Sequence, residues 1–314
     1  MKQLINILLI VLFSVSIGLS AESVLVSKKV DSPLKVDGIV ESVWDGIDGI
    51  EVEVSKMPEA ITLKNRELQD GKWLTLWNKD SQQENTVVTL KSAHTETEIF
   101  FLAEWPDKTN DNEHKTYHWD KEKEEYVSGK EREDRFVFTF SISGDFEACM
   151  ISSNEQTNDV WHWKAFRTNH VGIAHDKSHI ITLTKPAMIA GKHFLPDGKP
   201  VYILRPSDGG SSPYKMISHF NGKEFDELEY MGADDIPAYE VFIPDNQDAA
   251  DVKAKGVWND AKWTLEAGRR LKTGFEETDV QFELNSEVPM AIATFDHSGD
   301  NLHLLSEKII LKVE

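Results

Sequence analysis

The feature that most constrains the fold is a succession of short segments in which apolar and polar residues alternate, with turn residues between them. Alternation with a period of two is typical of a strand that buries one face, whereas an amphipathic helix repeats every 3.6 residues. No clear helical repeat is found beyond the N-terminal leader. Many short strands separated by turns predict an all-β sandwich or barrel.

The expected strands run along most of the chain. Residues 134–142 are typical, because Phe136, Phe138 and Phe140 fall on one face. A brief helical turn at 41–44 is expected to point Trp44 inward. The other expected strands cover residues 50–55, 87–93, 98–105, 159–167, 179–187, 262–271, 280–285, 288–298 and 307–314.

Two stretches interrupt this pattern. Residues 107–134 are highly charged, so we expect a surface loop or hairpin, with solvated carboxylates over 121–134. Residues 186–261 are rich in Gly, Pro and Asp and lack a clear alternating pattern, apart from 200–206 and 238–244. We expect them to form a long insertion between two core strands. Long insertions tend to carry function or to cover a site. We therefore expect a single domain over residues 22–314.

Residues 1–21 are typical of an export signal. Lys2 gives a basic start, an apolar run follows at 4–19, and small residues come next. We expect cleavage near Ser20 or Ala21 and a periplasmic location. Leu19 makes the cleavage site imperfect, so an uncleaved N-terminal anchor is the alternative.

The formal net charge of −20 argues against nucleic acid, and against an anionic membrane surface, as the main partner. A single cysteine, Cys149, excludes an internal disulfide and a zinc site built on several thiolates. It also excludes the Cys-x-x-Cys-His of ordinary c-type haem attachment. No nucleophile elbow, phosphate loop or dinucleotide fingerprint is present, so we do not expect the chain to be an enzyme by itself.

One segment gathers an unusual mixture of side chains. Cys149 and Met150 precede the run Trp-His-Trp-Lys at 161–164. As a strand, this run places both indoles on one face, and His162 and Lys164 on the other. The segment alone fits either a core strand or the lining of a site for a large, flat, redox-active group.

Several motifs occur in a characteristic order: VDGIVESVW, FFLAEWPDKT, EDRFVFTFSI, DVWHWKAFRTNHVGIAHD and WTLEAGRRLKTG. In these, the sequence resembles the ethylbenzene-dehydrogenase-related haem-binding family, which includes haem b γ subunits of periplasmic molybdenum enzymes related to dimethyl sulfoxide reductase. The resemblance covers nearly the whole chain beyond the leader. It implies a β-sandwich of the DOMON or carbohydrate-binding-module-9 type that holds one non-covalent haem b. It also implies electron transfer, either with a molybdenum/iron-sulfur oxidoreductase or other redox proteins as partner, or as a stand-alone cytochrome.

The resemblance also implies a set of site residues. In the γ subunits, the iron ligands are a methionine shortly before the Trp-rich run and a lysine near the last strand. Met150 stands in the first place, and His303 stands in the second, where an imidazole is a common haem ligand. Cys149 and His297 are the alternatives. The implied supporting residues are Trp161 and Trp163 as apolar walls, and Lys164, Arg167 and Arg269 as partners of the haem propionates.

A second hypothesis is an exported carbohydrate-binding module in which Trp161 and Trp163 stack on sugar rings. The exposure of the indoles discriminates between the two, because a sugar platform lies open whereas the wall of a haem site is buried. A third hypothesis is a haem-based sensor, which needs an open sixth coordination position.

Overall fold

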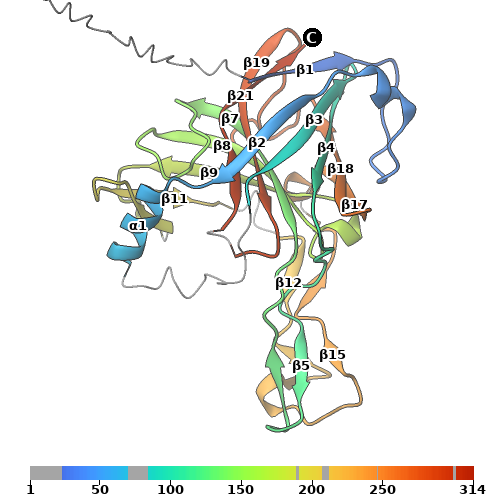
Figure 1. Ribbon diagram of the computed structural model, residues 1–314, viewed down its shortest axis with the longest axis vertical. Helices are drawn as coiled ribbons and strands as arrows, with labels where there is room; N and C mark the ends of the chain where they lie inside the picture. The colour runs from blue at the N-terminus through green and yellow to red at the C-terminus, as the bar shows by residue number, and fades with distance from the viewer. Residues whose placement is uncertain (1–22, 70–83, 189–190, 207–211, 246, 300–301) are drawn as a thin grey trace, which may run out of the picture.

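The computed structural model describes residues 23–69, 84–188, 191–206, 212–245, 247–299 and 302–314 (Figure 1). The export signal expected at 1–21 lies outside these residues. Within the described ranges, no helix combines the length and the apolar character needed to cross a membrane.

One large sheet forms most of the molecule. Its strands are β1 (Ser23–Lys29), β2 (Ile50–Lys56), β3 (Thr86–His94), β4 (Glu98–Pro106), β7 (Arg135–Gly144), β8 (Gln156–Lys164), β9 (His175–Thr182), β10 (Gly191–Phe194), β11 (Pro200–Leu204), β17 (Lys253–Asn259), β18 (Lys262–Arg270), β19 (Ser286–Phe295), β20 (Leu304–Ser306) and β21 (Ile309–Val313).

The remaining elements are short. Three small sheets consist of β5 (Tyr117–Asp120), β6 (Glu125–Ser128) and β15 (Asp235–Ile236), of β12 (Tyr214–Met216) and β16 (Tyr239–Val241), and of β13 (His219–Phe220) and β14 (Lys223–Glu224). The helices are α1 (Glu59–Leu68) and the 3-10 turns η1 (Ser42–Gly46), η2 (Asn169–Val171), η4 (Phe225–Glu227) and η5 (Asp248–Ala250).

The large sheet folds over on itself into a sandwich. Its strand order is β10-β11-β9-β8-β7-β19-β20-β2-β3-β4-β18-β17, and β1 pairs in parallel with β21 and β3. The half with β7 and β8 packs on the half with β4 and β18. Across this core the ring centroids of Phe101 and Phe138 are 5.2 Å apart, and those of Trp163 and Trp263 are 5.0 Å apart. The predicted all-β sandwich is confirmed.

The alternation along β7 and β8 decides which side chains enter that core. Phe136, Phe138 and Phe140 of β7 all belong to the buried cluster, as do Trp161 and Trp163 of β8. The residues between them therefore project from the opposite, outer face of the sheet. Trp44 is buried from η1, as expected.

One local prediction is wrong, and one helix was not predicted. Residues 280–285 alternate, but they form no strand. Their backbone makes isolated hydrogen bonds instead of a strand ladder. The Val280 carbonyl accepts from Arg269, and the Phe282 N–H donates to the carbonyl of Leu271. The helix α1 was not expected, because only Ile61 and Asn65 of its residues are buried and its apolar repeat is weak.

The charged stretch 107–134 contains the β5–β6 hairpin, as predicted, and projects away from the sandwich (Figure 1). The prediction that all its later carboxylates are solvated is wrong for Glu133 and Asp134, which are fully buried. Glu133 pairs with Arg167, and Asp134 accepts a hydrogen bond from Nε1 of Trp263.

The stretch 186–261 begins after β9 and ends before β18. It contains more strands than its alternating stretches at 200–206 and 238–244 indicated, and those two stretches form β11 and β16. β10 and β11 extend one end of the large sheet, and β17 pairs with β18 along its whole length at the other end. Only its middle part forms separate small sheets, in which β12 pairs with β16 and β13 pairs with β14.

Candidate functional site

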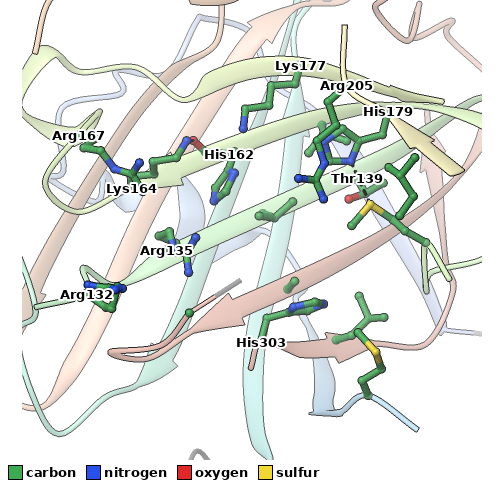
Figure 2. A pocket seen from close by; sticks show the side chains of 18 of the residues that line it. Arg132, Arg135, Thr139, His162, Lys164, Arg167, Lys177, His179, Arg205 and His303 are labelled. Carbon is green, nitrogen blue, oxygen red and sulfur yellow. Dashed lines mark hydrogen bonds between the residues drawn. The ribbon is translucent and has the colours of Figure 1, made fainter. Parts of the chain in front are cut away.

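A cavity of about 320 Å³ lies on the outer face of the sheet, within the usual size range of ligand sites, about 300–1,000 Å³ (Figure 2). Strands β7, β8 and β9 are neighbours in the sheet, so their outward side chains form one floor. Those side chains are Arg135, Val137, Thr139, Val160, His162, Lys164, Lys177 and His179.

One end of the cavity is lined by apolar and sulfur-bearing side chains. Cys149 and Met150 come from the segment between β7 and β8, and Met57 comes from the end of β2. Sδ of Met150 lies 3.0 Å from Nδ1 of His179. Burial holds the pKa of His179 well below its usual value, so its imidazole is neutral. A thioether and a neutral imidazole are both donors for a transition metal.

His303 reaches the same cavity from the segment between β19 and β20. Its ring centroid lies 5.0 Å from that of Phe295. Figure 2 shows His303 across the floor from His179. The structure thus brings Met150 and His303, which are far apart in the sequence, to one cavity.

The two alternative ligands lie differently. His297 is not among the lining residues. Its Nδ1 lies 2.9 Å from Oδ1 of Asp111, and its backbone N–H donates to Asp134. Cys149 does line the cavity, but burial raises the pKa of its thiol, and the protonated form is a poor metal ligand.

The charged side chains that line the cavity within the described residues are all cationic, although the whole chain is strongly acidic. They are Lys115, Arg132, Arg135, Lys164, Arg167, Lys177 and Arg205. Figure 2 shows Arg132, Arg135, Lys164 and Arg167 gathered at one end, away from Arg205 and His179. The arrangement favours a ligand that carries carboxylates or other anionic groups.

Lys164 is the cation at this end that most needs an anion. Its side chain is 1% exposed, and burial together with Lys177 and Arg167 holds its pKa well below the usual value. Its Nζ donates to the carbonyl of His162 at 3.2 Å, and it forms no ion pair within the described residues. Both Lys164 and Arg167 lie over the ring of Tyr214, at 5.3 and 4.7 Å from its centroid, but Arg167 is already paired with Glu133.

Two histidines of the floor carry buried nitrogens without a hydrogen-bond partner. These are Nε2 of His162 and Nε2 of His179. Buried polar atoms are rarely left unpaired in proteins, so such atoms beside a cavity indicate a bound group. His179 was not predicted from the sequence as a site residue. The usable signal was its two-residue spacing from Lys177, which places both side chains on one face of a strand.

Three residues that we expected at the haem site do not line this cavity. Trp161 and Trp163 point into the core, because alternation puts them on the face opposite His162. They neither wall this cavity nor form an open sugar platform. Arg269 is fully buried, with its Nη1 within 3.3 Å of three aspartates, and does not reach the cavity.

Comparison with solved structures finds remote likeness to carbohydrate-binding proteins. A carbohydrate binding module of family 9 from Caldicellulosiruptor kristjanssonii, in complex with glucose, is 8% identical and aligns over 93% of this chain and 97% of its own, with a TM-score of 0.37. A putative carbohydrate-binding protein from Bacteroides uniformis is 12% identical over 94% of this chain and 100% of its own, with a TM-score of 0.39. These scores are too low to support an argument about function.

None of the curated proteins matches the chain. The family described as ethylbenzene dehydrogenase matches residues 41–303. The match takes in the strands of the cavity floor, the Met150 segment and His303 itself. Because it covers most of the sequence, the chain belongs to the ethylbenzene dehydrogenase family.

Proposed function

We propose that this protein is an exported haem b protein that transfers single electrons. The observation that supports the proposal best is the convergence of Met150 and His303 on one cavity lined by cations. Family membership supports the same function. The burial of Trp161 and Trp163 removes the sequence feature that favoured a sugar-binding module.

The residues present fit haem b. A haem needs axial donors, apolar walls and cations for its propionates. Met150 and His303 would hold the iron, and Lys164 would meet a propionate. The apolar lining includes Val137, Val160, Ile203, Ala293 and Leu305. When bound, haem supplies a one-electron iron couple, and a Met/His ligand pair tends to hold a high potential.

In this proposal the chain's own residues position the ligand atoms and bury the bound haem. His179, kept neutral by burial, contacts the thioether of Met150 and limits where that sulfur can point. Lys164 and Arg167 lie at the cationic end, and side chains of β7, β8 and β9 form the floor on which the ligand would rest. Such a site passes electrons and needs no catalytic nucleophile or base.

The partner in this proposal is a periplasmic molybdenum/iron-sulfur oxidoreductase, for which the chain serves as a γ-like subunit, or another redox protein. Family membership supports this class of partner. The net charge of −20 suits docking to a basic face on the partner.

The first experiment is a visible spectrum of the purified, haem-loaded protein with a pyridine haemochrome assay. We expect a Soret band and a haem b spectrum. A haem c spectrum would indicate attachment through Cys149, and a protein without a Soret band would refute haem binding.

The ligands are then tested by substitution. Met150→Ala and His303→Ala should each alter the low-spin spectrum, and the double variant should abolish it. The controls are Met188→Ala, a methionine that is 77% exposed, and His219→Ala, whose side chain is 52% exposed. If the double variant keeps the wild-type spectrum, the ligand assignment is refuted even where haem still binds.

A further inference from the structure

Three carboxylates meet at the edge of the sandwich near β4, β7 and β19. Asp107 follows β4, Asp134 directly precedes β7, and Asp296 directly follows β19. The antiparallel pairing of β7 with β19 puts Arg135 opposite Phe295, which brings Asp134 close to Asp296. One oxygen of each carboxylate lies within 4.8 Å of the other two.

Asp107 and Asp134 are buried, and Asp296 is partly buried. Asp134 accepts hydrogen bonds at both carboxylate oxygens, whereas the carboxylate of Asp107 is incompletely satisfied. Asp134 is 0% exposed and Asp107 is 5% exposed. Oδ1 of Asp107 accepts a hydrogen bond from the N–H of Thr109, but its Oδ2 is buried without any partner. Lys108 acts on Asp296 at longer range. In the part of the chain that is described, no lysine or arginine forms an ion pair with any of the three carboxylates. Buried charges of one sign require a counter-ion or protonation.

A second buried group of three aspartates shows what the first one lacks. Asp159, Asp176 and Asp279 also bring their carboxylates together. Their shared counter-ion is Arg269, whose Nη1 lies 2.9, 3.2 and 3.3 Å from the three. The protein therefore compensates one cluster with a guanidinium and leaves the other without a cation of its own.

We propose that Asp107, Asp134 and Asp296 bind a Ca²⁺ ion. Ca²⁺ takes six to eight oxygen ligands in flexible geometry, and carboxylates are its usual anionic ligands. Mg²⁺ is bound more often through one or two carboxylates and keeps several waters. No sulfur or imidazole belongs to the group, which disfavours zinc. Waters and backbone carbonyls would complete the shell.

This ion would join three segments that are distant in the sequence. One of them is the segment after β19, which leads from Asp296 to His303 at the cavity. Asp134 adjoins Arg135, which lines the same cavity. Ca²⁺ would thus anchor the end of β19, a short distance along the chain from the proposed second haem ligand. This link to His303 rests on the proposed function, whereas the ion site itself does not.

The test uses the full exported protein without haem, so that its result is separate from haem binding. After treatment with a chelator and dialysis, Ca²⁺ is titrated while the thermal midpoint and the bound metal are measured. We expect one Ca²⁺ per chain, a rise in the midpoint, and weaker binding of Mg²⁺. Tb³⁺ in the site should also luminesce on tryptophan excitation, because Nε1 of Trp263 donates to Asp134 at 3.0 Å.

The decisive variant is Asp107→Asn, which removes the charge of the carboxylate with the unpaired oxygen. We expect Ca²⁺ binding to weaken by roughly tenfold or more, since ligand charge sets affinity. The metal-free variant should be at least as stable as the metal-free wild type, because one repulsive charge is gone. Asp296→Asn serves as a second variant, and Asp279→Asn, in the cluster that contains Arg269, as the matched control.

Two results would overturn the proposal. One is a wild-type protein that takes up no Ca²⁺ at about 10 mM, above the usual range of weak extracellular sites. The other is a variant pattern in which Asp279→Asn abolishes binding, while Asp107→Asn and Asp296→Asn retain it.

Discussion

The buried ion cluster around Arg269 gives a sharp test of how this core is stabilised. Nη1 of Arg269 lies 2.9 Å from Asp159, 3.2 Å from Asp176 and 3.3 Å from Asp279. Nη2 donates to the carbonyl of Val280 at 2.7 Å. The four charged side chains have no exposed surface, so solvent does not screen them.

Arg269→Met removes the charge and keeps much of the apolar stem. Breaking a buried ion pair from one side costs about 3–5 kcal/mol, because the remaining charge stays buried and unpaired. Here one guanidinium compensates several carboxylates, so we expect a loss at the upper end, about 4–5 kcal/mol. Since small domains have a total stability of about 5–15 kcal/mol, this single change should bring the protein near its unfolding threshold.

The loss should depend on pH. Burial raises the pKa of Asp279 to about 7 and that of Asp176 well above 3.8, and Arg269 opposes both shifts. Without Arg269 these carboxyls have still higher pKa values in the folded state than in the unfolded chain. Such a group opposes folding progressively as the pH rises from about 4 to its folded pKa. The variant should therefore lose less stability at pH 5 than at pH 8.

Urea unfolding at both pH values, followed by tryptophan fluorescence, measures this effect. Lys28→Met is the control, because it removes one partner of an ion pair whose side chains are 41% and 51% exposed, and it should leave the midpoint unchanged. Adding Asp159→Asn to Arg269→Met should recover part of the loss. A loss below about 1 kcal/mol at pH 8, or an equal loss at both pH values, would refute the reasoning.

Three further predictions concern the cavity and the core. Lys164→Gln should weaken haem binding by about 10- to 100-fold in a haem titration, as expected for the loss of a charged hydrogen bond. The substitution should not destabilise the haem-free protein. An unchanged affinity for haem would show that no propionate meets Lys164. Gly256→Ala should cost about 1–3 kcal/mol in urea unfolding, because the added Cβ would lie 2.4 Å from a ring carbon of Trp163, whereas Gly46→Ala, with open space around its Cβ, should cost less. Burial lowers the pKa of His193 to about 4, so the folded wild type resists protonation there while the unfolded chain takes up a proton below about pH 6.5. His193→Asn should therefore lose less stability on acidification than the wild type, by about 1.4 kcal/mol per pH unit down to pH 4. Parallel profiles of urea midpoint against pH would contradict this.

The strand faces of the site followed from local alternation, but the side that became the core did not. On β8, the period of two separates Trp161 and Trp163 from His162 and Lys164. The pattern alone does not say which pair faces the other half of the sandwich. The indoles bury far more apolar surface than a histidine and a lysine, and aromatic side chains on β4 and β18 meet them there.

The alternating pattern also failed to predict strands correctly where the backbone bonds to residues distant in the sequence. Residues 280–285 alternate like a strand, but their backbone groups are bound by Arg269 and Leu271 at isolated points. β17 shows the reverse. It lay within a stretch that looked like an insertion, yet it completes the edge of the sheet by pairing with β18.

The sequence by itself determined that the chain is all-β, that Met150 shortly precedes an aromatic strand, and that His162 and Lys164 share a face of that strand. These properties depend on residues a few positions apart. The tertiary structure alone decided that Met150, His179 and His303 line one cavity. That convergence depends on the strand order from β9 through β8 and β7 to β19. A period-two pattern within one strand does not encode which strands pair or in which register.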